Sequence, residues 1–250
     1  MTGEQTIDMH DAKAASTSLA QGEEKRAMVR AMFDAVAPRY DLLNRLISCG
    51  LDMSWRRRTV SALALPERSR VLDLACGTGD LCRLLAQRGL VPIGLDMSEG
   101  MLRRGHSGAP LVLGDASSLP FRDGSFDGAV CAFGLRNFTE IPTVIAELSR
   151  VVRPGGRIAL LEVAIPASAL VRTGYRLWFE HAVPAIGSLV SDRDAYRYLP
   201  DSVEYLPPPP KLLATLRRQG FAGAQRRTLS GGTTQLLTAT RAGVLIGGAT

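Results

Sequence analysis

The sequence has few lysines and no long apolar run, and both shortages narrow the kind of protein it can be. Lysine occurs only at Lys13, Lys25 and Lys211, so almost all of the 30 basic residues are arginine. No stretch reaches the roughly 18 uninterrupted apolar residues that a membrane-spanning helix needs. The first residues are polar and include acids, which is not typical of a secretory signal. We therefore expect a cytoplasmic protein.

Cysteine is also scarce, and its spacing excludes the common metal and disulfide frameworks. Cys49, Cys76, Cys82 and Cys131 form no C-x-x-C pair, and none lies near a histidine at zinc spacing. We expect reduced thiols that mostly fill the core, and we predict no metal site.

The charge balance is basic, with a formal net charge of +6 and a pI of about 9.5. The arginines are scattered, apart from the run Arg56-Arg57-Arg58, and no basic stripe has interleaved aromatic residues. Nucleic-acid binding is therefore not expected. A basic face that touches anionic lipid is the more favoured reading of the charge.

The composition is that of a globular chain, with 46% hydrophobic and 22% charged residues among 250. Residues 1–22 show no periodicity and are predicted to be a disordered tail. Residues 23–241 are predicted to form a single domain, and residues 242–250 a flexible C-terminal tail.

Helical periodicity extends from Lys25 to Leu65 and is interrupted twice, at Pro38 and at Cys49-Gly50. Ser54 is the expected N-cap of the third helix. Strands and helices then alternate, which implies a parallel sheet with helices on both faces. The expected strands are 70–74, 91–96, 111–115, 126–133 and 157–162. An apolar and aromatic insert at 170–190 follows, and two further candidate strands flank Gly231-Gly232.

A strand that runs into a glycine loop, Val71 to Asp80, is the strongest local signal. The dinucleotide fingerprint needs a third glycine where Cys82 stands, so NAD is disfavoured. No phosphate-binding lysine follows, which excludes a P-loop. A ligand can approach the backbone closely at Gly77 and Gly79, because glycine has no Cβ.

Acids follow the next two strands of the predicted sheet. Asp96 suits a ribose diol, and Asp115-Ala116 suits the edge of an adenine. Each acid alone could be a helix N-cap. Because the carboxyl ends of parallel strands meet at one edge, the glycine loop and both acids together favour a nucleoside without phosphate.

These motifs resemble those of class I S-adenosylmethionine-dependent methyltransferases: D-L-A-C-G-T-G-D, L-D-M-S-E-G-M-L, G-D-A-S-S-L-P-F and R-V-V-R-P-G-G. Further runs resemble the demethylmenaquinone/ubiquinone ring C-methyltransferase family. They are P-R-Y-D-L-L-N, S-C-G with W-R-R, F-G-L-R-N, H-A-V-P-A-I-G-S-L-V and Y-R-Y-L-P-D-S. The resemblance spans roughly residues 30–229. One departure is Ala132, where the family often has serine.

The resemblance implies a fold and a site. The fold is α/β, with a Rossmann-like seven-stranded class I methyltransferase sheet, helices on both faces, an N-terminal helical cap and a helical insert after the fifth strand. The residues implied to hold S-adenosyl-L-methionine are Asp73, Gly77, Thr78, Gly79, Asp96, Met97, Asp115 and Ala116. The implied catalytic residues are Arg136, Asn137, His181 and Tyr40, with Tyr196 and Tyr198 binding the substrate.

Methylation of a ring carbon needs an activated acceptor, because the carbon is a poor nucleophile until an adjacent hydroxyl loses its proton. Arg136 can stabilise the resulting oxyanion but cannot be the base, so His181 or a water held by Asn137 is the candidate acceptor. The structural alternatives are a surface ion pair for Arg136, a hydrogen-bonded core residue for His181 and packing for the tyrosines.

The family resemblance thus predicts an S-adenosylmethionine-dependent C-methyltransferase that converts a demethylmenaquinol to a menaquinol. The expected partners are an isoprenoid quinol and, transiently, the inner face of the cell membrane, with no nucleic acid; a homodimer stays open. One alternative is a methyltransferase of the same fold that acts on a soluble small molecule or natural product. Another is a non-catalytic protein that binds the donor or a partner.

Overall fold

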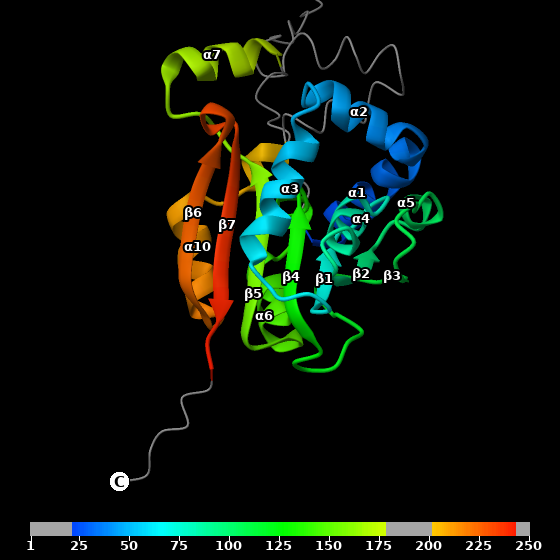
Figure 1. Cartoon of the computed structure of the whole chain (residues 1–250). Helices are drawn as coiled ribbons and strands as arrows, with labels where there is room; N and C mark the ends of the chain where they lie inside the picture. The colour runs from blue at the N-terminus through cyan, green and yellow to red at the C-terminus, as the bar shows by residue number, and fades with distance from the viewer. Residues whose placement is uncertain (1–21, 179–201, 244–250) are drawn as a thin grey trace, which may run out of the picture.

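A seven-stranded mixed sheet forms the centre of the protein in a computed structural model, which describes residues 22–178 and 202–243 (Figure 1). The strand order is β3-β2-β1-β4-β5-β7-β6. The strands are β1 Arg70–Leu74, β2 Val91–Asp96, β3 Leu111–Leu113, β4 Phe126–Ala132, β5 Val152–Val163, β6 Phe221–Leu229 and β7 Thr234–Arg241. The seven-stranded α/β fold implied by the sequence motifs is therefore confirmed.

The parallel arrangement predicted for the five strands that alternate with helices is confirmed, and the two candidate strands that flank Gly231-Gly232 are β6 and β7. Strands β1 to β5 are mutually parallel, whereas β7 pairs antiparallel with both β5 and β6. Only the 3₁₀ turn Ser230–Gly232 and Thr233 connect β6 to β7. A connection this short can join antiparallel strands but not parallel ones.

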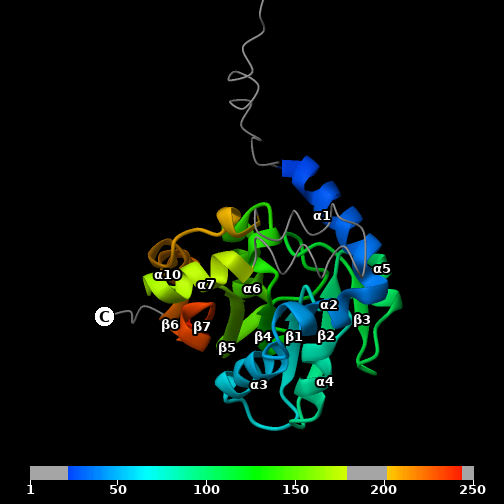
Figure 2. The same cartoon turned by 90° about the horizontal axis from the view of Figure 1, so that it is seen from above.

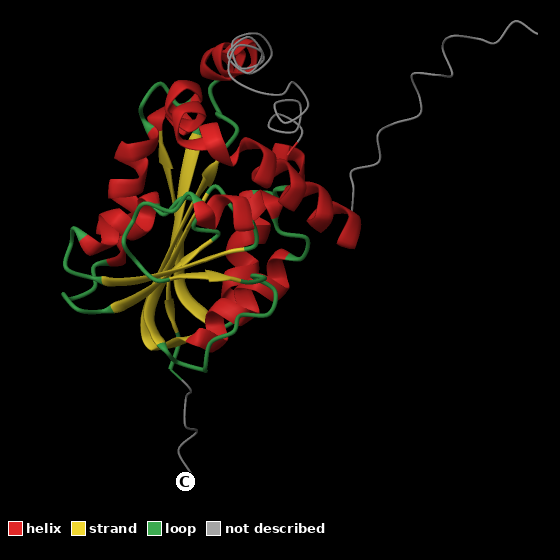
Figure 3. Cartoon of the chain, turned by 90° about the vertical axis from the view of Figure 1, so that its right-hand side faces the viewer, coloured by secondary structure: helices red, strands yellow, loops and turns green. Residues whose placement is uncertain are grey.

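Helices cover both faces of the sheet (Figure 3). Alternate side chains of each strand point to opposite faces, so Val71 packs with the α3 and α4 side, while Leu72 and Leu74 pack with the α6 side. Both faces of the central strands are mainly apolar, which is why these strands read as hydrophobic runs. The covering helices are α3 Asp52–Leu63, α4 Asp80–Ala86, α6 Ile141–Val151 and α10 Pro209–Arg218.

An N-terminal helical layer lies at the carboxyl ends of the parallel strands (Figures 1 and 2). Pro38 separates the first two helices of the described chain, as predicted, because proline ends the hydrogen-bond ladder of the first helix. Between them lies the 3₁₀ turn Ala37–Arg39. The helices of this layer are α1 Gly22–Val36, α2 Tyr40–Ile47 and, after β2, α5 Glu99–Arg103.

Serine hydroxyls accept backbone hydrogen bonds at the start of two helices. Ser98 caps α5, because its side chain accepts a hydrogen bond from the amide of Met101 at 3.1 Å. The prediction for Ser54 is wrong: α3 begins at Asp52, so Ser54 is inside the helix. Ser48, four residues before Asp52, instead accepts a hydrogen bond from its amide at 3.3 Å.

The insert after β5 contains α7, Ala169–Leu177, which lies at the same end of the molecule as α2 (Figure 1). The indole of Trp178 donates a hydrogen bond to the carbonyl oxygen of Ile47 at 3.1 Å, and this contact ties the insert to α2. The remaining short elements are the 3₁₀ turns Leu135–Asn137 and Val203–Tyr205. In the described part of the chain, no helix has the length and apolar character to span a membrane.

Candidate functional site

The glycine loop after β1 adopts a backbone shape that favours glycine at two positions. Gly77 has φ +56° and Gly79 has φ +89°, and a Cβ on Gly79 would lie 2.8 Å from the side chain of Ser107. A side chain at Gly77 would approach the ring of Tyr40 at 3.6 Å. Both glycines therefore let the loop pass close to its neighbours, because glycine has no Cβ.

Asp96, at the end of β2, holds the loop against the sheet. Its Oδ2 accepts a hydrogen bond from the amide of Gly77 at 2.8 Å, and its Oδ1 accepts one from the amide of Ser98 at 2.9 Å. Burial raises the pKa of this carboxyl, and the two amides oppose that effect. Each oxygen retains a second acceptor site for a ligand hydroxyl.

Asp115 follows β3, two residues after Leu113, which is the register partner of Asp96. Its Oδ1 accepts hydrogen bonds from the amide and the hydroxyl of Ser117, both at 2.7 Å. Its Oδ2 lies 3.3 Å from the guanidinium of Arg26, on α1. The predicted juxtaposition of acids at successive strand ends is thus present, and α1 reaches across it.

A cavity of about 390 Å³ opens beside the loop, and we call it the glycine-loop cavity. Leu95 and Met101 contribute apolar wall, and α1 contributes Val29 and Phe33. Seven of the predicted site residues line it: Tyr40, Gly77, Asp96, Met97, Asp115, Ala116 and Asn137.

Three residues predicted to contact the ligand do not line this cavity. Asp73 is buried beneath the loop, where its Oδ2 accepts hydrogen bonds from the amide and thiol of Cys82 at 3.1 and 3.3 Å. Burial raises its pKa to about 7. The hydroxyl of Thr78 donates to Asp41 at 2.7 Å, and Gly79 precedes α4. All three support the loop, and their contact with a ligand stays a prediction.

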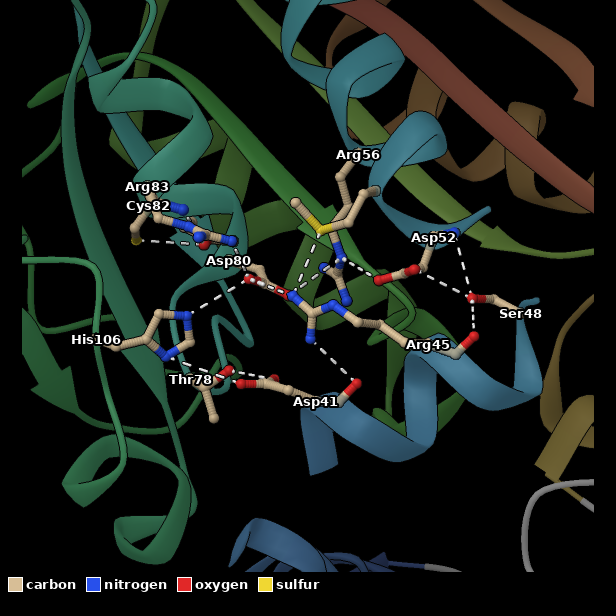
Figure 4. Close-up of polar contacts among 12 residues, drawn as sticks. Asp41, Arg45, Ser48, Asp52, Arg56, Thr78, Asp80, Cys82, Arg83 and His106 are labelled. Carbon is tan, nitrogen blue, oxygen red and sulfur yellow. Dashed lines mark hydrogen bonds and ion pairs between the residues drawn. The ribbon is translucent and has the colours of Figure 1, made fainter. Parts of the chain in front are cut away.

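A polar network ties α2, α3 and α4 together behind the loop (Figure 4). Its centre is Asp80, which is buried and accepts a hydrogen bond from Arg83 at 2.8 Å. Arg45 and Arg56 lie 3.7 and 4.0 Å from its carboxylate, and His106 lies 3.5 Å away. The network fixes the N-terminal helices relative to the glycine loop.

A second cavity of about 480 Å³ lies on the other side of Tyr40, and we call it the apolar cavity. Helices α2, α3 and α7 form much of its wall, with Trp55 and Trp178 among the aromatic residues. Its few polar groups include Asp52 and Arg136. The two cavities share three wall residues: Phe33, Tyr40 and Phe133.

The shared wall is built from packed rings. The rings of Phe33 and Tyr40 meet edge to face at a centroid distance of 6.0 Å. Phe133 has φ +61° and packs edge to face on Trp55 at 6.1 Å. Burial raises the pKa of Tyr40, with nearby Arg56 opposing that effect. The phenol is therefore held neutral between the cavities.

Arg136 is buried, so the alternative of a surface ion pair is wrong. Its Nη1 donates to Glu162 Oε1 and to the carbonyl oxygen of Phe133 at 2.9 Å, and its Nε donates to Ser202 at 3.1 Å. The side chain of Asn137 donates to the same carbonyl at 3.2 Å. Arginine and asparagine thus converge on the backbone of the shared wall.

Helix α1 is fastened over this region by Lys25. Its ammonium donates to the carbonyl oxygens of Arg136 and Phe138 at 3.0 and 2.9 Å, and it lies 3.8 Å above the ring of Tyr205. Burial lowers its pKa to about 8. The lysine satisfies two carbonyls at the 3₁₀ turn that carries the predicted catalytic pair.

Three predicted residues, His181, Tyr196 and Tyr198, lie outside the described residues. Three others at the site were missed. Glu162 is the last residue of the predicted strand 157–162 and the last but one of β5, so the strand-end pattern could have found it. Asp52 lies between the quoted S-C-G and W-R-R runs, and Trp55 opens the second, but the pattern assigned no role to either.

The cysteines match the expectation of core thiols, with one exception. Cys76, Cys82 and Cys131 are buried, and burial raises the pKa of each thiol. Cys49 is exposed and lines the apolar cavity. Among the described residues, no group of three or more histidine, cysteine or acidic side chains could hold a metal ion.

The strand order, the glycine loop and the paired strand-end acids define a class I methyltransferase fold. Phosphoethanolamine N-methyltransferase 2 of Haemonchus contortus, solved with S-adenosyl-L-methionine, has this fold: the TM-score is 0.57 at 13% identity, covering 76% of this chain and 53% of that one.

The chain belongs to the ubiE/COQ5 methyltransferase family, whose sequence model matches residues 20–241. It is 44% identical to a demethylmenaquinone methyltransferase of Deinococcus radiodurans, over 80% of this chain and 87% of that protein. It is 41% identical to the ubiquinone/menaquinone biosynthesis C-methyltransferase UbiE of Syntrophotalea carbinolica, over 85% of this chain and 93% of that protein.

Proposed function

We propose that this protein transfers a methyl group from S-adenosyl-L-methionine to the ring of a demethylmenaquinol, forming a menaquinol. The observation that carries the proposal is the pair of cavities that meet at Phe33, Tyr40 and Phe133. One has carboxylates suited to a nucleoside, and the other is apolar and aromatic. Two ligands bound there would meet at the shared wall, which is the geometry that an in-line transfer needs.

The residues of the glycine-loop cavity fit the donor. Asp96 would accept hydrogen bonds from the ribose hydroxyls, while Asp115 and Ala116 would lie beside the adenine edge. When bound, the donor supplies an electrophilic methyl group on a sulfonium. Leu95, Met101 and Val29 give an apolar wall without phosphate-binding lysines, which suits a nucleoside that carries no phosphate.

The residues of the apolar cavity suit a fused aromatic ring. Trp55, Phe133 and Tyr175 offer ring faces and edges, and burial raises the pKa of Tyr175 to about 12, so it is neutral near pH 7. Arg136 provides a cation that would stabilise the oxyanion of a ring hydroxyl. Glu162 and the carbonyl oxygen of Phe133 hold that cation in place.

The exposed apolar side chains support the further proposal of transient contact with the inner face of the cell membrane. Six of the nine large ones among the described residues lie on α2, on α7 and in the segments that adjoin these helices: Leu42, Leu46, Leu51, Ile165, Leu170 and Leu177. Leu170 is 84% exposed, and Arg172 and Arg176 on the same helix are exposed cations. Apolar side chains beside cations match an anionic lipid surface, where an isoprenoid tail would be anchored.

The test is transfer of a labelled methyl group to demethylmenaquinols of several tail lengths. We expect label on the ring carbon, and retention on vesicles that contain anionic lipid. No ring methylation at any tail length would favour the alternative of a soluble acceptor. The quinone profile of a host that lacks the gene, with and without the gene restored, gives the same answer in cells.

A further inference from the structure

One acidic side chain in the wall of the apolar cavity has no role in the scheme above. Asp52 is the first residue of α3, and it is 2% exposed. It lines the apolar cavity together with Tyr40, Phe133 and Arg136. A carboxylate so deeply buried is costly unless partners compensate its charge, so its contacts decide what it can do.

Its two oxygens are unequally satisfied. Oδ1 accepts a hydrogen bond from the hydroxyl of Ser48 at 3.1 Å (Figure 4). Oδ2 makes no hydrogen bond with any residue that the structure describes. Nε of Arg56 lies 3.9 Å from Oδ2, too far for a hydrogen bond. One oxygen of a buried carboxylate therefore retains its capacity to accept a proton.

The charges around Asp52 come from three packed elements. Arg56 on α3 faces it, and Arg56 also lies 4.0 Å from Asp80 of α4. Ser48 directly follows α2, and the helix itself contributes Arg45, further along the same network. The guanidinium of Arg56 lies 5.5 Å from the ring centroid of Phe133, so Asp52 is separated from the shared wall by one side chain.

We propose that Asp52 accepts the proton of the ring hydroxyl, which makes the adjacent ring carbon nucleophilic. This inference rests on the proposed function and names its general base, a role that Arg136 cannot fill. An arginine stays protonated near neutral pH, so it can stabilise an oxyanion but not take a proton. The two side chains line one cavity, and their roles are complementary: Asp52 takes the proton and Arg136 stabilises the oxygen.

The proton and electron balance closes without a further reactant. The hydroxyl proton moves to Asp52, and the oxygen electron pair forms a carbonyl as the ring carbon takes the methyl group. The carbon–sulfur bond breaks, and its electron pair stays on sulfur. The methylated carbon then loses its hydrogen to water as a proton, and Asp52 returns its proton to the oxygen. One proton is released in each turnover.

The experiment uses the full chain with a short-tailed demethylmenaquinol and compares Asp52→Asn with Asp52→His. Asparagine keeps the shape and can still accept from Ser48, but it cannot act as a base. We expect kcat to fall at least about 100-fold in Asp52→Asn. Histidine is a different proton acceptor from a carboxylate, so in Asp52→His the acidic limb of the kcat profile should move to higher pH than in the wild type.

Two binding measurements separate this role from a structural one. Asp52→Asn should bind S-adenosylhomocysteine as the wild type does, because Asp52 does not line the glycine-loop cavity. Its affinity for 1-naphthol, a stable probe of the ring hydroxyl, should fall about tenfold with the loss of a charge-assisted hydrogen bond.

Asp80→Asn is the matched control. This substitution removes the other carboxylate near Arg56, and Asp80 lines neither large cavity. Any loss of rate in Asp80→Asn should therefore leave the acidic limb of the kcat profile at the wild-type pH. A wild-type rate in Asp52→Asn, or an unmoved acidic limb in Asp52→His, would overturn the inference and leave the proposed function standing. If the wild type fails to methylate the quinol, both fail together.

Discussion

Arg136 and Glu162 form a buried ion pair, with 2.5 Å between Nη1 and Oε1, at the wall of the apolar cavity. Glu162 also accepts from the amide of Arg136 at 3.2 Å and from the amide of Val163 at 2.9 Å. One carboxylate at the end of β5 therefore fixes both the side chain and the backbone of the residue expected to stabilise the acceptor.

Replacing Glu162 by glutamine should cost both stability and rate. Removal of one partner leaves a buried guanidinium without its compensating charge, which typically destabilises by about 3 to 5 kcal/mol. Urea unfolding measures the stability, and kcat with the quinol measures the rate. The matched control is Glu99→Gln, which breaks the exposed pair with Arg103 and should change neither. Equal stability of the two variants would contradict the prediction.

Replacing Asp96 by alanine should abolish most of the affinity for the donor. The change removes the proposed ribose contact and also the acceptor that holds the amide of Gly77. We expect calorimetry to show an affinity for S-adenosylhomocysteine lower by at least about tenfold, the effect of one charge-assisted hydrogen bond. Asp127→Asn removes a carboxylate paired with Arg153, outside both cavities, and should bind normally. Unchanged binding by Asp96→Ala would argue against the donor site.

Asp73 should make stability depend on pH. Its folded-state pKa is raised from 3.8 to about 7 by burial. A carboxyl whose pKa is higher in the folded state stabilises the protein fully at pH values below its unfolded-state pKa. That stabilisation is lost as the pH rises through its folded-state pKa. The unfolding free energy of the wild type relative to Asp73→Asn should therefore fall between about pH 4 and about pH 7. Urea unfolding of both proteins across that window measures the difference, and a constant difference would contradict it.

Tyr40 should act mainly through its ring. Tyr40→Phe keeps the wall between the two cavities, so its kcat should stay within about threefold of the wild type, an energy below about 0.7 kcal/mol. Tyr40→Ala would join the cavities and admit water, and we expect kcat to fall by about 100-fold or more as the alignment is lost. Steady-state kinetics compares the pair. A loss in Tyr40→Phe as large as in Tyr40→Ala would assign the hydroxyl a direct chemical role.

The strand-end motifs predicted five of the residues that line the glycine-loop cavity, for a local reason. A parallel strand, a glycine turn and the next helix are consecutive in the chain, so Gly77, Asp96 and Asp115 could be placed without knowing the packing. Thr78 is different. Its hydroxyl turns to Asp41, a residue 37 positions away, and no local pattern could show that contact.

The sequence by itself determined the alternating strands and helices, the loop after β1 and the acids at the ends of β2 and β3. It did so because hydrophobic periodicity and glycine backbone preferences act over a few residues. Only the tertiary structure decided that Phe33, Tyr40 and Phe133 form a wall shared by two cavities. It also decided that Glu162 holds Arg136 and that Asp52 lines the apolar cavity. Those contacts join segments far apart in the chain, and they form only when the helices pack over the ends of the strands.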